Sequence, residues 1–122
     1  MSAAIIIFAH GSSVESANQA VRVVAADAAQ RGAFPDYEVA FLDFPPRLRE
    51  AVDRLTGRGW KRIVVVPYFL TLGIHLQRDL PGVVEQLRES HPGVEIQVTD
   101  PLDGHPALAQ IVVERAHRAT GE

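Results

Sequence analysis

Two histidines follow apolar segments of the type that forms buried strands. His10 ends the apolar run 3–9 and opens a loop at residues 11–13, and His75 lies beyond a second apolar run at 62–69. A neutral imidazole binds divalent metal ions and accepts a proton near neutral pH, because its unperturbed pKa is about 6.5. If the fold brings the two histidines together, they predict a site for metal binding or proton transfer.

The elements that must position these histidines alternate along the chain. Four segments rich in Val, Ile or Phe predict strands at about residues 4–9, 38–43, 62–69 and 95–99. Between and after them, apolar residues recur at helical spacing. These stripes are Ala17, Ala20, Val21, Val24, Ala25 and Ala28; Leu48, Ala51, Val52 and Leu55; Leu80, Val83, Val84 and Leu87; and Leu108, Ile111 and Val112.

This alternation predicts a three-layer α/β fold of one domain, residues 1–122. Its core is a doubly wound, parallel, four-stranded sheet of order 2-1-3-4, of the flavodoxin-like type. Ligands of such sheets bind beyond the carboxyl ends of the strands, where the winding reverses. Here that point lies between the first and third strands, so His10 and His75 are expected to face one crevice. Asp43, at the end of the second strand, adds a carboxylate, and all three side chains are expected to converge on one ion.

Each of these residues also has a simpler interpretation. A single histidine at a strand end is often a hydrogen-bonded surface residue, and an aspartate there often caps a turn. His91 fits a helix C-terminus, His117 a solvent-facing helix position, and His105 a turn or helix start at the same rim.

Ser12 and Ser13 lead from His10 into the first helix. Free backbone N–H groups at a helix N-terminus favour a carboxylate or phosphate, although serines there are also common helix caps. The chain has neither a P-loop pattern nor a dinucleotide-binding glycine pattern. Chemistry driven by ATP is therefore not expected.

Residues 68–76 are unusually apolar for a loop that connects a strand to a helix. A flat hydrophobic ligand, a partner subunit or the chain's own helices would cover this stretch. Arg78 follows it and can hold a carboxylate in a bidentate manner close to His75. Arg47 and Arg49 add to a basic rim in the same region, and of the three arginines Arg78 is the preferred candidate.

Composition narrows the function classes. The 122 residues are 47% hydrophobic and 22% charged, with a net charge of −3, which is typical of a soluble domain and gives no sign of nucleic-acid binding. No apolar run approaches the roughly 20 residues of a membrane span. The start of the chain lacks the pattern of a secretory signal, so we expect a cytoplasmic protein. The absence of cysteine leaves histidine and carboxylate as the available metal ligands.

Several segments resemble the sirohydrochlorin chelatases of the class II chelatase group. The matching segments are His10-Gly11-Ser12, residues 40–43, 62–70, 73–81, 91–94 and 101–106. They span nearly the whole chain in consistent order, and the block through Pro81 is quite specific. The resemblance to the short, single-domain members implies a homodimer that inserts Co²⁺ or Fe²⁺ into sirohydrochlorin without ATP, for cobalamin or siroheme synthesis. The ion is a substrate, and no permanent cofactor is expected.

By position, His10 and His75 match the two active-site histidines of that family. The resemblance implies that they share metal delivery and proton abstraction with help from Asp43. We expect the substrate to be bound by Ser12, Ser13, Tyr68, Leu72, Gly73, Ile74 and Arg78.

The chain departs from the family pattern at two positions. Asp43 stands where the family usually has glutamate, and Ser13 where it commonly has arginine. A shorter carboxylate and a lost positive charge leave open a different class of function, a carrier that holds metal or tetrapyrrole without turnover. A hydrolase with a resident metal is a weaker alternative. The choice among cobalt, iron and nickel also stays open.

Overall fold

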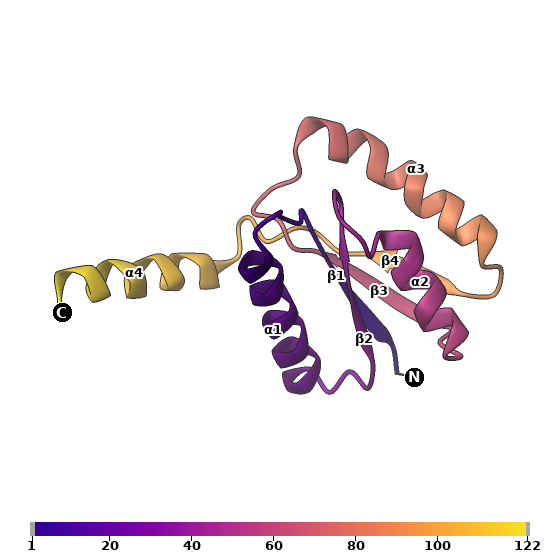
Figure 1. Cartoon of the computed structure of the whole chain (residues 1–122), viewed down its shortest axis with the longest axis horizontal. Coiled ribbons are helices and arrows are strands. Elements are labelled where there is room, and N and C mark those ends of the chain that lie inside the picture. Colours follow the sequence, from indigo (N-terminus) through magenta and orange to yellow (C-terminus); the bar gives the residue numbers. More distant parts are fainter. Residues whose placement is uncertain (1, 122) are drawn as a thin grey trace.

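A parallel four-stranded sheet of order β2-β1-β3-β4 forms the centre of the molecule (Figure 1). The structure is a computed structural model that describes residues 2–121. Its strands are β1 (Ala4–Ala9), β2 (Tyr37–Phe41), β3 (Arg62–Pro67) and β4 (Glu95–Val98). The predicted order is confirmed. Three strands end one or two residues earlier than predicted, so Asp43 lies in a loop rather than in β2.

Four helices alternate with the strands: α1 (Glu15–Arg31), α2 (Leu48–Gly57), α3 (Ile74–Ser90) and α4 (Pro106–Thr120). Right-handed crossovers place α1 on one face of the sheet and α2 and α3 on the other. None of the helices in the described part of the chain is long and apolar enough to cross a membrane.

The larger core lies between the sheet and the pair α2 and α3. The predicted stripe of α2 is fully buried, as are Leu80, Val84 and Leu87 of α3. Val83 is 42% exposed because it points into an opening between the two helices. The α3 stripe prediction was therefore wrong at this one position.

The smaller core lies under α1, where Ala25 and Ala29 pack against Ile5 and Ile7 of β1. Of the predicted α1 stripe, Ala25 is buried, and Val21 and Ala28 are partly buried. Ala17, Ala20 and Val24 are exposed, and the residue that is buried in the first turn is the polar Asn18.

Helix α4 differs from the other three helices. It extends away from the body of the molecule (Figure 1), and none of its residues is buried. Its predicted apolar stripe is therefore uncovered, with Ile111 48% and Val112 67% exposed.

Candidate functional site

His10 and Asp43 lie side by side beyond the carboxyl ends of β1 and β2. His10 Nδ1 is 3.3 Å from Asp43 Oδ2, and both side chains are more than half exposed. The backbone sets this proximity, because Leu42 N donates to the Ala9 carbonyl (2.9 Å) and Asp43 N donates to the His10 carbonyl (3.1 Å). The two loops thus continue the ladder of β1 and β2 by one step, and this step aligns imidazole and carboxylate.

The loop after His10 turns sharply at Gly11, which has a φ of +88°. A Cβ atom at this position would lie 2.8 Å from Phe44 Cδ2 and 3.1 Å from Phe41 Cβ. Only glycine combines this backbone conformation with such a close approach. Gly11 therefore lets the histidine loop pack against the loop that carries Asp43.

Asn18 of α1 holds the same loop from below. Its side chain accepts a hydrogen bond from Ser12 N (2.9 Å) and donates one to the Ser12 carbonyl (2.8 Å), and the residue is only 6% exposed. The Ser12 hydroxyl in turn accepts from Val14 N (3.0 Å). The Ser12 side chain is thus engaged in the turn before α1, whereas Ser13 is exposed.

His75 lies in the first turn of α3, next to a charged pair. Arg78 Nη2 is 3.3 Å from His75 Nδ1, and Arg78 Nε donates to Asp79 Oδ1 (3.0 Å). The hydrogen bond from Arg78 lowers the pKa of Asp79, and the charge of His75 lowers it further. Asp79 in turn raises the pKa of Arg78. Arg78 is therefore a charged donor that occupies one nitrogen of His75.

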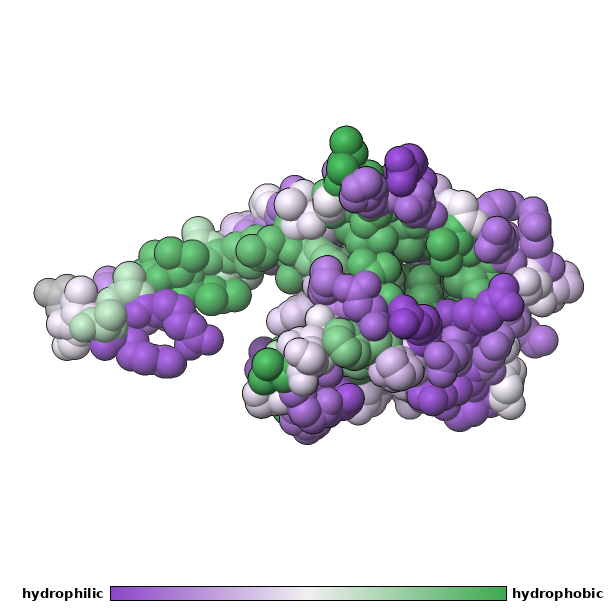
Figure 2. All heavy atoms as spheres, turned by 45° about the horizontal axis from the view of Figure 1, so that its top comes forward, coloured by the Kyte–Doolittle hydropathy of each residue, from purple (hydrophilic) through white to green (hydrophobic). Residues whose placement is uncertain are grey.

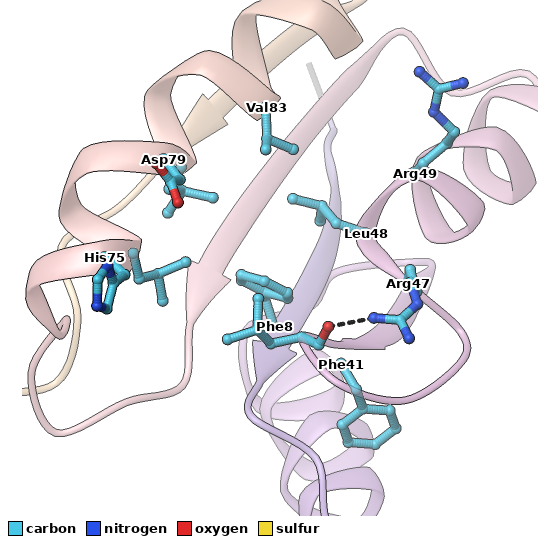
Figure 3. Close-up of a pocket in the computed structure, with 11 residues that line it drawn as sticks. Phe8, Phe41, Arg47, Leu48, Arg49, His75, Asp79 and Val83 are labelled. Atoms are coloured by element: carbon cyan, nitrogen blue, oxygen red, sulfur yellow. Dashed lines mark hydrogen bonds between the residues drawn. The ribbon is translucent and has the colours of Figure 1, made fainter.

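A cavity of about 430 Å³ opens between α2 and α3, over the end of β1 (Figure 3). This volume is within the range of small-molecule sites. The figure shows Phe8 at its floor, His75 and Asp79 on the α3 side, and Arg47 on the α2 side. The lining is mostly apolar, and it also includes Phe41, Leu42, Leu48, Arg49, Leu76, Leu80 and Val83.

Two of the three arginines considered in the sequence lie at this cavity. Arg47 and Arg49 line the cavity, whereas Arg78 is not among its lining residues. Arg47 is also fixed by its own bonds, since Nη1 donates to the Leu42 carbonyl at 2.5 Å. The signal in the sequence is their place at the start of α2, directly across the switch point from His75.

The apolar loop residues predicted to bind substrate lie outside this cavity. Tyr68 packs on the α1 face of the sheet, and Leu72 packs against the core under α3. Gly73 precedes α3, and Ile74 is 79% exposed. Phe69, which the sequence did not single out, links the two halves of the site. Its ring meets those of Phe8 and His10 edge-on, with centroids 5.8 and 6.3 Å apart.

The predicted convergence of three metal ligands is absent. Among residues 2–121, no group of three or more histidine, aspartate and glutamate side chains is placed to hold a metal ion. His10 pairs with Asp43, whereas His75 begins a helix and contacts Arg78. The site therefore presents two separate imidazoles, each beside one charged partner.

Comparison with known proteins assigns this arrangement to a family. The sequence model of CbiX matches residues 4–119. The chain belongs to the CbiX family. The sirohydrochlorin cobaltochelatase of Methanopyrus kandleri is 31% identical over 98% of both chains. The chloroplastic sirohydrochlorin ferrochelatase of Arabidopsis thaliana is 29% identical over 91% of this chain, which spans half of that protein.

A solved structure supports the same assignment. The crystal structure of a CbiX protein from Marinobacter aquaeolei matches with a TM-score of 0.83 and 28% identity over 98% of both chains. The CbiX fold therefore extends over the whole of the described chain, including the sheet edge that carries His10, Asp43 and His75.

Proposed function

We propose that this CbiX-family protein inserts Co²⁺ or Fe²⁺ into sirohydrochlorin without ATP. The observation that carries the proposal is the pair of exposed imidazoles, His10 with Asp43 and His75 with Arg78, beside an apolar cavity. Similarity to a cobaltochelatase and to a ferrochelatase supports both ions. Because cobalt and iron differ little in their preference for imidazole, the residues do not favour one ion.

Insertion of the ion places three requirements on the protein. Two pyrrole N–H protons must leave the ring, four ring nitrogens replace water on the ion, and the macrocycle must be held in place. Imidazole serves the first two needs, and the apolar cavity with Arg47 and Arg49 serves the third, since guanidinium binds peripheral carboxylates.

The partners of the two histidines assign them different roles. His10 Nδ1 faces a carboxylate, so this nitrogen carries the proton and Nε2 keeps a free lone pair. His75 Nδ1 faces Arg78, which can only donate, so Nε2 of the neutral ring carries the hydrogen. In this arrangement His10 is the first base or ligand.

His75 becomes available when Arg78 turns away. A substrate carboxylate competes with Asp79 and His75 for the Arg78 guanidinium, and its binding would release the Nδ1 lone pair of His75. Substrate binding and activation of the second histidine are then coupled through one arginine, whose side chain is 69% exposed.

Alanine variants test this assignment. We expect His10→Ala to lower the rate of Co²⁺ insertion at least about a hundredfold, and His75→Ala to lower it less. The insertion rate is followed by the absorbance change of sirohydrochlorin. His117→Ala, an exposed histidine on α4, is the matched control and should retain the full rate. Near-normal rates in both site variants would refute the chelatase site.

A carrier is the second candidate, because Asp43 is shorter than the family's usual glutamate and residues 2–121 contain no three-ligand cluster. A carrier would bind Co²⁺ or sirohydrochlorin stoichiometrically and would leave the spontaneous insertion rate unchanged. Rates measured with Co²⁺, Fe²⁺ and Ni²⁺ under anaerobic conditions separate carrier from enzyme and identify the preferred ion. We also propose that the protein acts as a homodimer.

A further inference from the structure

Arg47 is the residue at which the cavity meets the loop that carries Asp43. It directly precedes α2 and lines the cavity together with Arg49 (Figure 3). Figure 2 shows hydrophobic atoms in the hollow of the body of the molecule and hydrophilic residues around its border. Two positive side chains at an apolar hollow suit a ligand that carries carboxylates. The two arginines differ, however, in what their guanidinium groups contact.

The guanidinium of Arg47 bonds to the backbone of the loop 42–46. Nη1 donates to the Leu42 carbonyl at 2.5 Å, which Figure 3 draws as a dashed line. Nη2 makes a longer bond, of 3.4 Å, to the Asp43 carbonyl. A guanidinium has five N–H groups in a planar fork, so one arginine can bridge two neighbouring carbonyls. Both bonds go to main-chain oxygens, and the Asp43 carboxylate remains available to His10.

These bonds complete the restraint on the backbone of Asp43, whose loop belongs to no helix or strand. In the peptide group before Asp43, the carbonyl accepts from Arg47 and the N–H donates to the His10 carbonyl (3.1 Å). In the peptide group after Asp43, the carbonyl accepts from the same guanidinium. Because peptide groups are planar, holding both of them restrains the φ and ψ of Asp43 and so the direction of its side chain. The carboxylate is thereby kept 3.3 Å from His10 Nδ1.

Arg47 is itself held at the start of α2. Its N–H donates to Glu50 Oε1 (3.2 Å), and its carbonyl accepts from Ala51 N (3.1 Å). The next residue, Leu48, is 5% exposed and packs in the larger core. The guanidinium therefore joins a fixed part of the fold to the loop, which allows it to transmit the position of α2 to Asp43.

Arg49 is a natural comparison for Arg47. It lines the same cavity and is exposed, and its side chain makes no hydrogen bond or ion pair with residues 2–121. Arg49 can therefore meet a ligand in the cavity, but it has no contact that reaches Asp43. A difference between variants of the two arginines isolates the effect of the loop bonds from that of a positive charge at the cavity.

We propose that Arg47 is a positioning residue that holds the Asp43 carboxylate against His10 from the wall of the cavity. The inference rests on the proposed function, because His10 is the first base or ligand there. With the carboxylate in place, His10 Nδ1 carries the hydrogen and Nε2 keeps its lone pair. Without the two bonds from Arg47, the backbone of Asp43 rotates more freely and the imidazole exchanges between its two tautomers. A smaller fraction of the molecules then presents the Nε2 lone pair.

The first experiment measures the tautomer of His10 in the full chain by NMR of the imidazole nitrogens, at about pH 8, where histidine is ordinarily neutral. We expect hydrogen mainly on Nδ1 in the wild type and in Arg49→Met, and a mixture of tautomers in Arg47→Met. Arg47→Lys keeps the charge but not the fork, and it should give the same mixture. Asp43→Ala is the reference for the lost pair, and His10→Ala identifies the signals. A wild-type tautomer in either Arg47 variant, or a mixture in the wild type, overturns the proposal.

The kinetics of Co²⁺ insertion separate positioning from substrate binding. We expect Arg47→Lys to lower kcat at least about tenfold and to change the KM for sirohydrochlorin less than about twofold. Arg49→Met should instead raise KM and change kcat less. A raised KM with an unchanged kcat in Arg47→Lys overturns the positioning role, because Arg47 would then only bind substrate. The NMR experiment needs neither metal nor sirohydrochlorin, so the expected tautomers without insertion by any variant would support the role of Arg47 and refute the chelatase function.

Discussion

Asn18 is expected to govern both the stability of the fold and the position of His10. It is a buried polar residue of α1 that pairs with both backbone groups of Ser12, two residues beyond the histidine. Asn18→Ala removes both bonds and leaves the Ser12 N–H and carbonyl without these partners. Each neutral hydrogen bond contributes about 1 kcal/mol net, so we expect a loss of about 2 kcal/mol in the free energy of unfolding.

This loss corresponds to a Tm decrease on the order of 6–10 °C for a domain of this size. Thermal unfolding followed by circular dichroism measures it. Gln30→Ala is the control, because Gln30 is exposed in the last turn of the same helix. It should change the Tm very little.

The activity of the same variant tests the positional role. A domain with about 5 kcal/mol or more of stability stays almost entirely folded after losing about 2 kcal/mol, so unfolding cannot explain a large loss of rate. We expect kcat/KM for Co²⁺ insertion to fall at least about tenfold, because a displaced catalytic group lowers the rate steeply. A variant with a lowered Tm and a wild-type rate would show that Asn18 only stabilises the fold. An unchanged Tm would refute the hydrogen-bond argument itself.

Two further predictions concern the backbone and an ion pair. Gly11→Ala should lower the free energy of unfolding by about 2 kcal/mol, because the positive φ strains an alanine and its Cβ would contact Phe44. Gly73→Ala is the control and should not lower it, because the space around its Cβ position is open. Chemical denaturation measures the free energy of unfolding of both variants. Asp36→Asn should lower the free energy of unfolding by about 1–2 kcal/mol at pH 7. Arg58 donates two hydrogen bonds to the Asp36 carboxylate and lowers its pKa, and the substitution removes the negative charge that accepts them. The lowered pKa stabilises the fold above the ordinary carboxyl pKa of about 3.9, and this contribution is lost as pH falls further. The Tm difference between variant and wild type should therefore shrink below about pH 4, and a difference that stays constant with pH would contradict the ion-pair explanation.

The sheet order could be predicted because it depends on features that are local in the sequence. Apolar runs bounded by turn residues identify the strands, and the helical stripes between them require parallel crossovers of one hand. The α2 stripe was confirmed at all four positions for the same reason. From this order alone, the ends of β1 and β2 meet, which correctly placed His10 beside Asp43.

The details that failed depend on contacts between distant segments. The α4 stripe has the same spacing as that of α2, yet the anchored turn at 99–105 directs it away from its own sheet. Residues 68–76 were expected to lie under a ligand, a partner subunit or the chain's own helices, and the structure divides them: Tyr68 and Leu72 pack on opposite faces of the sheet, whereas Leu76 lines the cavity. Asn18 escaped notice because periodicity counts apolar residues, and a buried asparagine within an alanine-rich helix interrupts that pattern.

The loose arrangement of the histidines suits an ion that must leave the protein. A three-ligand site would hold the ion against the ring nitrogens, and the energy of that binding would have to be regained in the transition state. His10, 65% exposed and paired through Nδ1 with Asp43, keeps its other nitrogen open to solvent, where hydrated ions arrive. His75 contacts Arg78, which in the proposed mechanism a substrate carboxylate draws away. A site that completes its ligand set only when the tetrapyrrole is bound would avoid storing metal in its absence, and its two histidines would act in sequence rather than as one preformed centre.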